Sequence, residues 1–183
     1  SSYTQKGRSG FRGKGSCLLH RKGEKQMQPL ELYIHIPFCV KKCAYCDFLS
    51  GPAGEKEKEE YVKMLVDEIR NCPDTVQNYR VISIFFGGGT PSLLTGEQIG
   101  RLMDTVREIF TLDEDAEITM EMNPGTVTEE KLRKYRQAGV NRLSIGLQSV
   151  NDEELRLLGR IHTYEEFREA YHLARANGFA NIN

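Results

Sequence analysis

Apolar and polar positions alternate with two different periods along the chain, and the two kinds of segment follow one another from Pro29 onward. Short runs of branched and aromatic residues indicate buried strands, and longer stretches with apolar residues three and four apart indicate amphipathic helices. The pattern predicts four full strands and the start of a fifth, at 30–36, 80–86, 116–122, 142–147 and 180–183. Helices are predicted between them, over 55–71, 95–110, 128–138, a short piece from 151, and 163–177.

Capping residues mark where several of these helices begin and end. Thr95 with Gln98, and Thr163 with Glu166, have the spacing of a capping box. Gly139 is placed to end the helix over 128–138. Strands that alternate with helices predict a parallel sheet, either of the Rossmann type or in a (β/α) barrel. The glycine fingerprint G-x-G-x-x-G of a Rossmann dinucleotide site is absent after the first strand.

Three cysteines follow the first predicted strand with the spacing C-x3-C-x2-C, namely Cys39, Cys43 and Cys46. Three thiolates on one short loop can ligate three irons of a 4Fe–4S cluster and leave the fourth iron open, whereas structural clusters usually take four cysteines. Zinc is the alternative metal, but structural zinc sites favour paired C-x2-C units and no second pair follows. A disulfide framework is disfavoured because the cysteines number five. Cys17 and Cys72 are interpreted as free thiols.

The longer string from Tyr33 to Phe48, Y-I-H-I-P-F-C-x3-C-x-Y-C-D-F, resembles the radical S-adenosylmethionine (SAM) superfamily. Within it the string is similar to the family of the heme chaperone HemW and the oxygen-independent coproporphyrinogen III oxidase. The resemblance implies an α/β fold, the N-terminal portion of a partial (β/α)6 TIM-like barrel with parallel strands and alternating helices. Such cores need six strands, and Asn183 falls at the start of the fifth. The chain is therefore expected to be truncated, with 29–183 an incomplete radical SAM core.

Groups of unusual residues stand where the predicted strands end, at the edge where barrel enzymes build their sites. The cysteines follow the first strand, three glycines the second, an E-x-N-P-G element the third, and Gln148 the fourth. The resemblance assigns Cys39, Cys43 and Cys46 to the cluster. It assigns SAM binding to eight residues, which are Tyr33, Tyr45, Gly88, Gly89, Thr90, Glu121, Gln148 and Arg160.

The implied roles of these residues differ, and most have a structural alternative. Tyr45 is expected near the SAM adenine, although it could simply pack the cysteine loop. The glycine turn allows close backbone approach to a ligand, and its alternative is a tight turn without one. Glu121 is expected to bond the ribose hydroxyls, or else to belong to an ordinary polar strand face. Gln148 would contact SAM at the rim, and Arg160 would meet its carboxylate or be an exposed helix-end arginine.

Two functions follow from the resemblance, and Phe48 separates them. A HemW-like protein would bind heme as cargo and deliver it to recipient proteins. The oxidase would convert coproporphyrinogen III to protoporphyrinogen IX, and it typically has a fourth cysteine at the position that Phe48 occupies. The sequence therefore favours a HemW-like heme chaperone that binds a 4Fe–4S cluster and SAM. The oxidase and an inactive truncated fragment are the alternatives, and no catalytic residue is identified.

Composition and charge limit the classes of binding partner and the cellular compartment that the sequence supports. The net charge of −1 gives no support to nucleic-acid binding, and no apolar run reaches transmembrane length. Residues 1–28 carry seven basic residues and one acid among glycines and serines, which predicts a disordered tail, with a mitochondrial presequence as the alternative. The odd cysteine count and abundant Lys and Glu predict a cytoplasmic protein. An open half-barrel would leave a strand edge uncovered, so self-association is expected.

Overall fold

The structure is a computed structural model, and it describes residues 27–40 and 50–183. The predicted disordered tail over 1–28 lies outside the described residues except for its last two, and Gln28 already belongs to the first strand. Two of the three predicted cluster ligands, Cys43 and Cys46, fall within 41–49 and also lie outside them.

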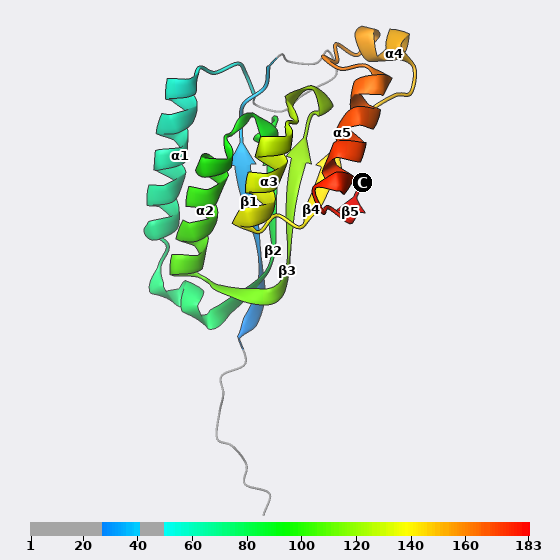
Figure 1. Ribbon diagram of the computed structural model, residues 1–183. Coiled ribbons are helices and arrows are strands. Elements are labelled where there is room, and N and C mark those ends of the chain that lie inside the picture. Colours follow the sequence, from blue (N-terminus) through cyan, green and yellow to red (C-terminus); the bar gives the residue numbers. More distant parts are fainter. Residues whose placement is uncertain (1–26, 41–49) are drawn as a thin grey trace, which may run out of the picture.

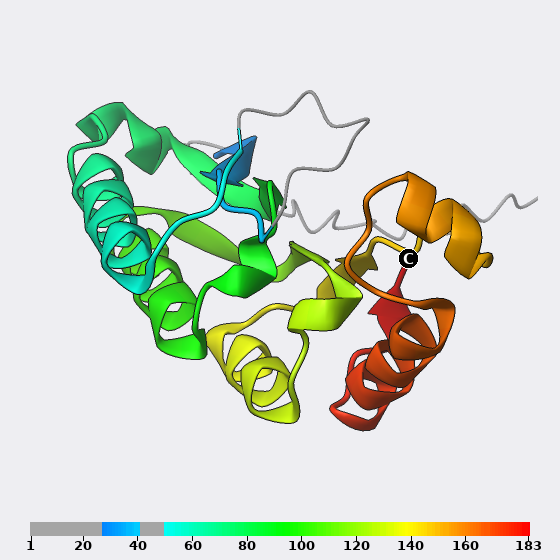
Figure 2. The ribbon, with the colours of Figure 1, turned by 90° about the horizontal axis from the view of Figure 1, so that it is seen from above.

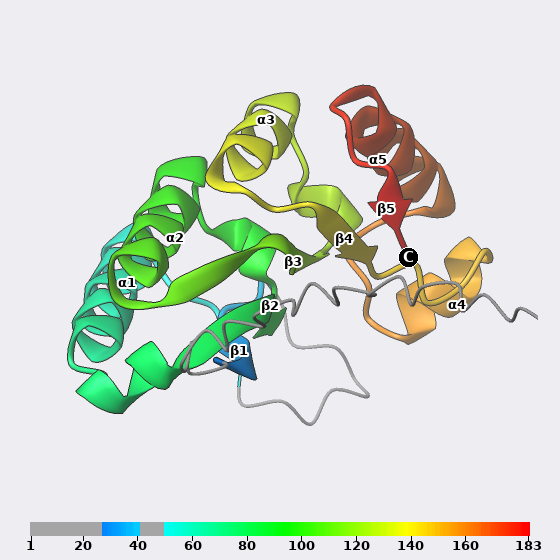
Figure 3. The same ribbon diagram turned by 90° about the horizontal axis from the view of Figure 1, so that it is seen from below.

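Five parallel strands form one sheet in the order in which they occur in the chain. This sequential order is typical of a (β/α) barrel, because a doubly wound sheet reverses its strand order at a switch point. The sheet curves without closing, which confirms the partial barrel (Figure 2, Figure 3). The strands are β1 (Gln28–Ile36), β2 (Tyr79–Gly88), β3 (Thr111–Met122), β4 (Arg142–Ile145) and β5 (Asn181–Ile182).

Helices connect the strands as predicted. The four long ones are α1 (Glu55–Arg70), α2 (Gly96–Ile109), α3 (Glu129–Ala138) and α5 (Tyr164–Ala176). They lie along the outer side of the curved sheet, whereas the short α4 (Asp152–Leu157) lies near the edge where the strands end (Figure 1, Figure 3). Short 3-10 helices occur at η1 (Asp74–Asn78), η2 (Pro91–Leu93) and η3 (Pro124–Thr126). Within the described residues, no helix combines the length and apolar character of a membrane span.

The register gives the sheet an apolar outer face and a more polar inner face. One row of buried apolar side chains runs in register across four strands, namely Ile34, Phe86, Met120 and Leu143. Burying such side chains against the helices stabilises the fold by about 1.5–3 kcal/mol each. Side chains alternate along a strand, so the next row belongs to the opposite, inner face. That row consists of Tyr33, Phe85, Thr119 and Arg142.

Helix ends follow the local signals closely. Thr95 and Thr163 each accept a hydrogen bond from the backbone N–H three residues on, and both capping boxes are complete. Gly139 ends α3 with a φ of 109°, the left-handed region that glycine adopts without strain. Because these interactions join residues within a few positions of each other, the sequence is sufficient to predict them.

Strand ends depart more from the prediction. β3 starts at Thr111 rather than at 116, because β2 continues to pair with it beyond a register shift, with Val81 opposite Leu112. β4 ends at Ile145 rather than at 147, so Gln148 lies further beyond the strand than predicted. Pairing with a distant strand decides both boundaries.

Candidate functional site

The segment after β1 carries Cys39, the predicted cluster ligand that lies among the described residues. Its backbone N–H donates to the Gly51 carbonyl at 2.9 Å, and the Gly51 N–H donates to the Pro37 carbonyl at 3.1 Å. These bonds hold together the two ends of the loop that contains Cys43, Tyr45 and Cys46. Because that loop lies outside the described residues, the roles of its three side chains stay predictions.

Tyr61 of α1 supports the same segment from the helix side. Its hydroxyl donates to the His35 carbonyl at 2.7 Å, and its ring meets Phe38 edge to face with 5.2 Å between centroids. Burial is the largest cause of its raised pKa, so the hydroxyl keeps its proton and remains a donor. The sequence pattern indicates Tyr61 only as one apolar position of a helix, and nothing local signals its contact with the end of β1.

The glycine turn after β2 interlocks with the cysteine segment. The Gly89 N–H donates to the Ile36 carbonyl at 2.8 Å, and the Thr90 N–H donates to the Phe38 carbonyl at 2.6 Å. A Cβ on Gly89 would stand 2.5 Å from that Phe38 oxygen and 3.0 Å from the Cys39 Sγ. The Thr90 hydroxyl lies 3.7 Å from the same sulfur. The absence of a side chain at Gly89 is therefore what lets the turn approach the thiol.

Gly88 requires glycine for two reasons. Its φ of 115° is a conformation that L side chains rarely adopt, and a Cβ there would stand 2.6 Å from the His35 imidazole. Its backbone N–H points across the sheet and donates to Glu121 Oε2 at 3.1 Å. The turn is thus tied to the ends of both neighbouring strands.

Glu121 lies on the inner face at the end of β3. Its neighbours along the strand, Met120 and Met122, are buried on the outer face, so the predicted alternation is correct and does not conflict with a binding role. Burial raises the pKa of Glu121, opposed by the hydrogen bond from Gly88. Partial burial and, secondarily, the nearby Glu121 carboxylate raise the pKa of Tyr33, which is 58% exposed on the same face. The two predicted residues therefore share one electrostatic environment.

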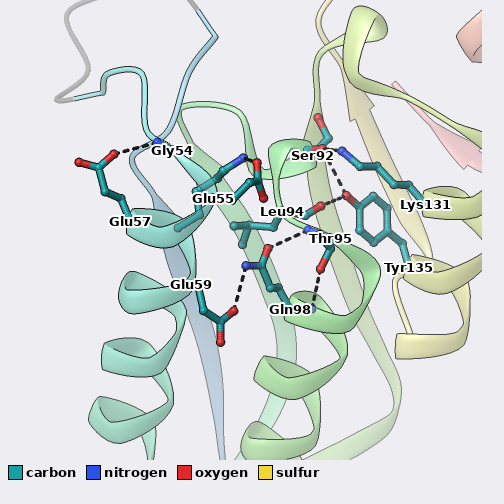
Figure 4. Close-up of polar contacts among 11 residues, drawn as sticks. Gly54, Glu55, Glu57, Glu59, Ser92, Leu94, Thr95, Gln98, Lys131 and Tyr135 are labelled. Atoms are coloured by element: carbon teal, nitrogen blue, oxygen red, sulfur yellow. Dashed lines mark hydrogen bonds and ion pairs between the residues drawn. The ribbon is translucent and has the colours of Figure 1, made fainter.

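A polar network connects Ser92 and Leu94, in the loop after the glycine turn, with α3, and Figure 4 shows Lys131 and Tyr135 bonded to their carbonyls. The Asn123 N–H donates to the Ser92 hydroxyl at 3.2 Å, that hydroxyl pairs with Thr126 Oγ1 at 2.5 Å, and Thr126 returns a bond to the Asn123 carbonyl at 2.8 Å. The Ser92 carbonyl accepts from Lys131 Nζ at 2.7 Å and from the Tyr135 hydroxyl at 3.3 Å. This network joins the loop after β2 to the loop after β3.

Lys131 and Tyr135 belong to α3 and were not identified from the sequence. Burial lowers the pKa of Lys131, with a further contribution from Lys58, and burial raises the pKa of Tyr135. The Tyr135 hydroxyl also donates to the Leu94 carbonyl at 2.6 Å. Their spacing of four along a helix shows that they share a face. The carbonyls that they bond come from a loop some 40 positions away, which no local pattern reveals.

Gln148 and Arg160 converge at Gly146, directly after β4. The Gly146 N–H donates to the Met122 carbonyl at 3.1 Å, which places it beside the end of β3. Arg160 Nη2 donates to the Gly146 carbonyl at 2.9 Å. A Cβ on Gly146 would stand 3.1 Å from Arg160 Nη2 and 3.2 Å from Gln148 Nε2. Arg160 is thus engaged with the strand end and is not an isolated exposed arginine.

The structure therefore brings most of the predicted residues to one edge of the sheet. Cys39, Gly89 and Thr90 are in contact, and Gly88 links them to Glu121. Among the described residues, no three His, Cys, Asp or Glu side chains converge as a metal site, and two of the three cluster ligands lie outside those residues. Cys72, predicted to be a free thiol, is free and lies at the end of α1.

Comparison with known proteins agrees with this geometry. The sequence pattern of the Radical SAM superfamily matches residues 33–183. The heme chaperone HemW of Escherichia coli is 48% identical over 86% of this chain and 42% of its own length. HemW of Bacillus subtilis is 38% identical over 82% of this chain and 40% of its own length. The chain spans about two fifths of the length of these relatives.

Solved structures show the same likeness. Coproporphyrinogen III oxidase (HemN) from Escherichia coli superposes with a TM-score of 0.79 and 36% identity, over 86% of this chain and 37% of that one. The structure of anSMEcpe with bound AdoMet, with a TM-score of 0.54 and 18% identity over 84% of this chain and 43% of that one, shares the fold. With its curved parallel sheet, its C-x3-C-x2-C loop and this match over most of its length, the chain belongs to the radical SAM superfamily.

Proposed function

We propose that this chain is the cluster- and SAM-binding part of a HemW-like heme chaperone. The observation that carries the proposal is the contact of the glycine turn with both Cys39 and Glu121. One short segment then joins the residue expected to ligate iron to the residue expected to bind SAM. The similarity to HemW of several organisms supports the chaperone in particular.

The residues present fit a 4Fe–4S cluster with an open iron. Cys39, Cys43 and Cys46 would hold it through thiolates, the ligand type that iron–sulfur clusters take. Gly89 has no side chain that would crowd the Cys39 sulfur, and the Thr90 hydroxyl lies 3.7 Å from that sulfur. When bound, such a cluster supplies an electron for reductive cleavage of SAM.

SAM would lie along the edge from the glycine turn to Arg160. The Glu121 carboxylate has acceptor capacity beyond its bond from Gly88 and would take the ribose hydroxyls. Carbonyls of Gly88 to Thr90 would accept from the ammonium group, and the Arg160 guanidinium would meet the carboxylate. Gln148 at the rim, Tyr33 on the inner face, and Tyr45 against the adenine complete the proposed set.

Two functions in heme metabolism are compatible with this site. HemN, a coproporphyrinogen III oxidase, is the solved structure with the TM-score of 0.79, which favours the oxidase as the second candidate. Phe48 stands where the oxidase typically has a cysteine, which favours the chaperone with heme as cargo. Recipient proteins, cytoplasmic location and self-association remain predictions from the sequence.

Anaerobic reconstitution with iron and sulfide, followed by EPR of the reduced protein with and without SAM, tests the proposal. We expect a cubane signal that changes when SAM is added and that Cys43→Ala abolishes. Cys72→Ala is the matched control, since this thiol lies at the other end of α1 from the cysteine segment and bonds the Glu68 carbonyl, and it should keep the signal. A signal indifferent to SAM would contradict the open-iron site. Titration with heme, set against turnover of coproporphyrinogen III, then separates the two functions.

A further inference from the structure

Gln148 is held in an unusual backbone conformation. Its φ of 68° lies in the left-handed region, and among the non-glycine residues that the structure describes it alone has a positive φ. This conformation is unfavourable for a residue with a Cβ, so the surrounding structure must maintain it. Such strain concentrates at binding sites, where it serves to place a side chain.

Two side chains of the following loop hold the chain immediately before Gln148. Arg160 Nη2 donates to the Gly146 carbonyl at 2.9 Å, and His162 Nε2 lies 3.3 Å from the Leu147 carbonyl. The consecutive carbonyls that precede Gln148 are therefore both bonded by residues from one loop. That loop is itself tied to α4, because the Arg160 N–H donates to the Leu155 carbonyl at 2.9 Å.

The state of His162 is fixed by its surroundings. The residue is 3% exposed, and because a carbonyl can only accept, Nε2 must carry the proton. Burial, with a further contribution from Arg160, lowers its pKa and favours the neutral ring. Nδ1 is buried and has no hydrogen-bond partner. An apolar side chain would avoid that unpaired nitrogen, so the bond to Leu147 is what the imidazole contributes here.

The side-chain amide of Gln148 lies on the same side of Gly146 as the Arg160 guanidinium. Gln148 Nε2 and Arg160 Nη2 both stand within 3.2 Å of the point that a Gly146 Cβ would occupy. A different φ at Gln148 would rotate its side chain about the N–Cα bond, relative to the Gly146 and Leu147 backbone. The geometry of the turn therefore decides whether these two polar groups act at the same place.

We propose that His162 is a positioning residue for SAM binding. By donating to the Leu147 carbonyl, it holds Gln148 in the left-handed conformation that lays its amide beside Arg160. The inference rests on the proposed function, because Gln148 and Arg160 are SAM contacts only within it. His162 itself touches neither the cluster nor SAM in this proposal.

Three substitutions separate the hydrogen bond from packing. His162→Gln places an amide N–H near the position of Nε2 and should restore the bond. His162→Asn carries the same amide on a shorter side chain that reaches only the position of Nδ1. His162→Leu keeps the volume without any donor. His172→Leu is the matched control, because His172 is exposed on α5 and contacts Tyr171.

Two measurements are made on the full chain. The Cα and Cβ chemical shifts of Gln148, recorded by NMR without cluster or SAM, report its backbone conformation. Equilibrium dialysis of the reconstituted protein gives the dissociation constant for SAM, with iron content as a check on the cluster. We expect His162→Asn and His162→Leu to lose the left-handed signature and to bind SAM roughly tenfold more weakly, the equivalent of one hydrogen bond. His162→Gln and His172→Leu should resemble wild type.

The outcomes distinguish this inference from the function on which it rests. Wild-type shifts at Gln148 in His162→Asn, or equal weakening of SAM binding in the Gln and Asn variants, would overturn the positioning role. If wild type binds no SAM, the proposed function fails, and the NMR comparison still decides whether His162 maintains the turn. Should His162→Leu fail to fold, the Gln and Asn pair carries the test.

Discussion

Gly89→Ala should damage both the fold and the proposed cluster site, although it adds a single methyl group. The new Cβ would stand 2.5 Å from the Phe38 oxygen and 3.0 Å from the Cys39 Sγ. Neither neighbour can move freely, because the Phe38 carbonyl accepts the Thr90 N–H at 2.6 Å and the Cys39 N–H bonds Gly51. Overpacking of this kind costs about 1–3 kcal/mol. The main-chain segment that carries Cys39, the first proposed ligand, would have to shift.

Gly100→Ala is the matched control for this change. Gly100 lies within α2, and a Cβ there would meet nothing within 4 Å. Alanine is favoured over glycine in a helix by about 0.5–1 kcal/mol, so this variant should be slightly more stable than wild type. The two glycine-to-alanine variants should therefore differ in unfolding free energy by roughly 1.5–4 kcal/mol.

Urea unfolding of the cluster-free chain, and iron and sulfide content after reconstitution, check the prediction. We expect Gly89→Ala to unfold at lower urea and to hold less cluster, and Gly100→Ala to do neither. If Gly89→Ala matched wild type in both measurements, the close approach of the glycine turn to Cys39 would not exist in solution. Lower stability with full cluster content would support the overpacking argument but would refute the idea that this crowding displaces Cys39.

Three further changes test other parts of the site. Burial raises the pKa of Glu121, so the folded state favours the neutral carboxyl, and the stability that this gives at low pH is lost as pH rises through the pKa. Glu121→Gln should therefore raise the melting temperature near pH 8 but not near pH 4. Calorimetry at both pH values checks this. The same variant should weaken SAM binding at least tenfold in dialysis, the size expected for a hydrogen bond to a charged group. Tyr135→Phe leaves the Leu94 carbonyl unbonded and should cost about 1–2 kcal/mol in urea unfolding, with Tyr171→Phe as the neutral control. Tyr61→Phe removes the bond to the His35 carbonyl and should cost about 1 kcal/mol while increasing amide exchange at the end of β1.

Each of these has an outcome that would refute it. A pH-independent effect of Glu121→Gln would mean that the carboxylate is not penalised by burial. Equal stability of the Tyr135 and Tyr171 variants would show that the Tyr135 hydrogen bond does not stabilise the fold. Unchanged exchange in Tyr61→Phe would show that α1 does not support the cysteine segment through that bond.

The sequence by itself determined the alternation of strands and helices, the helix caps and the identity of the candidate ligands. Thr95, Thr163 and Gly139 act within one turn of the chain, and the C-x3-C-x2-C spacing lies within one loop. Interactions of this range depend on neighbours in sequence, so residue type and spacing are sufficient to predict them. The family resemblance rested on the same local strings and supplied the barrel.

Only the tertiary structure decided how these pieces meet. The approach of Gly89 to Cys39, and the bond from Gly88 to Glu121, join residues that lie 50 and 33 positions apart in the sequence. Likewise, the carbonyls just before the left-handed Gln148 are bonded by the side chains of Arg160 and His162, and β4 ends where its pairing with β3 ends. Contacts of this kind are set by how strands pair and how close two backbones can come. No local pattern records either quantity, because each depends on a partner that folding alone brings near.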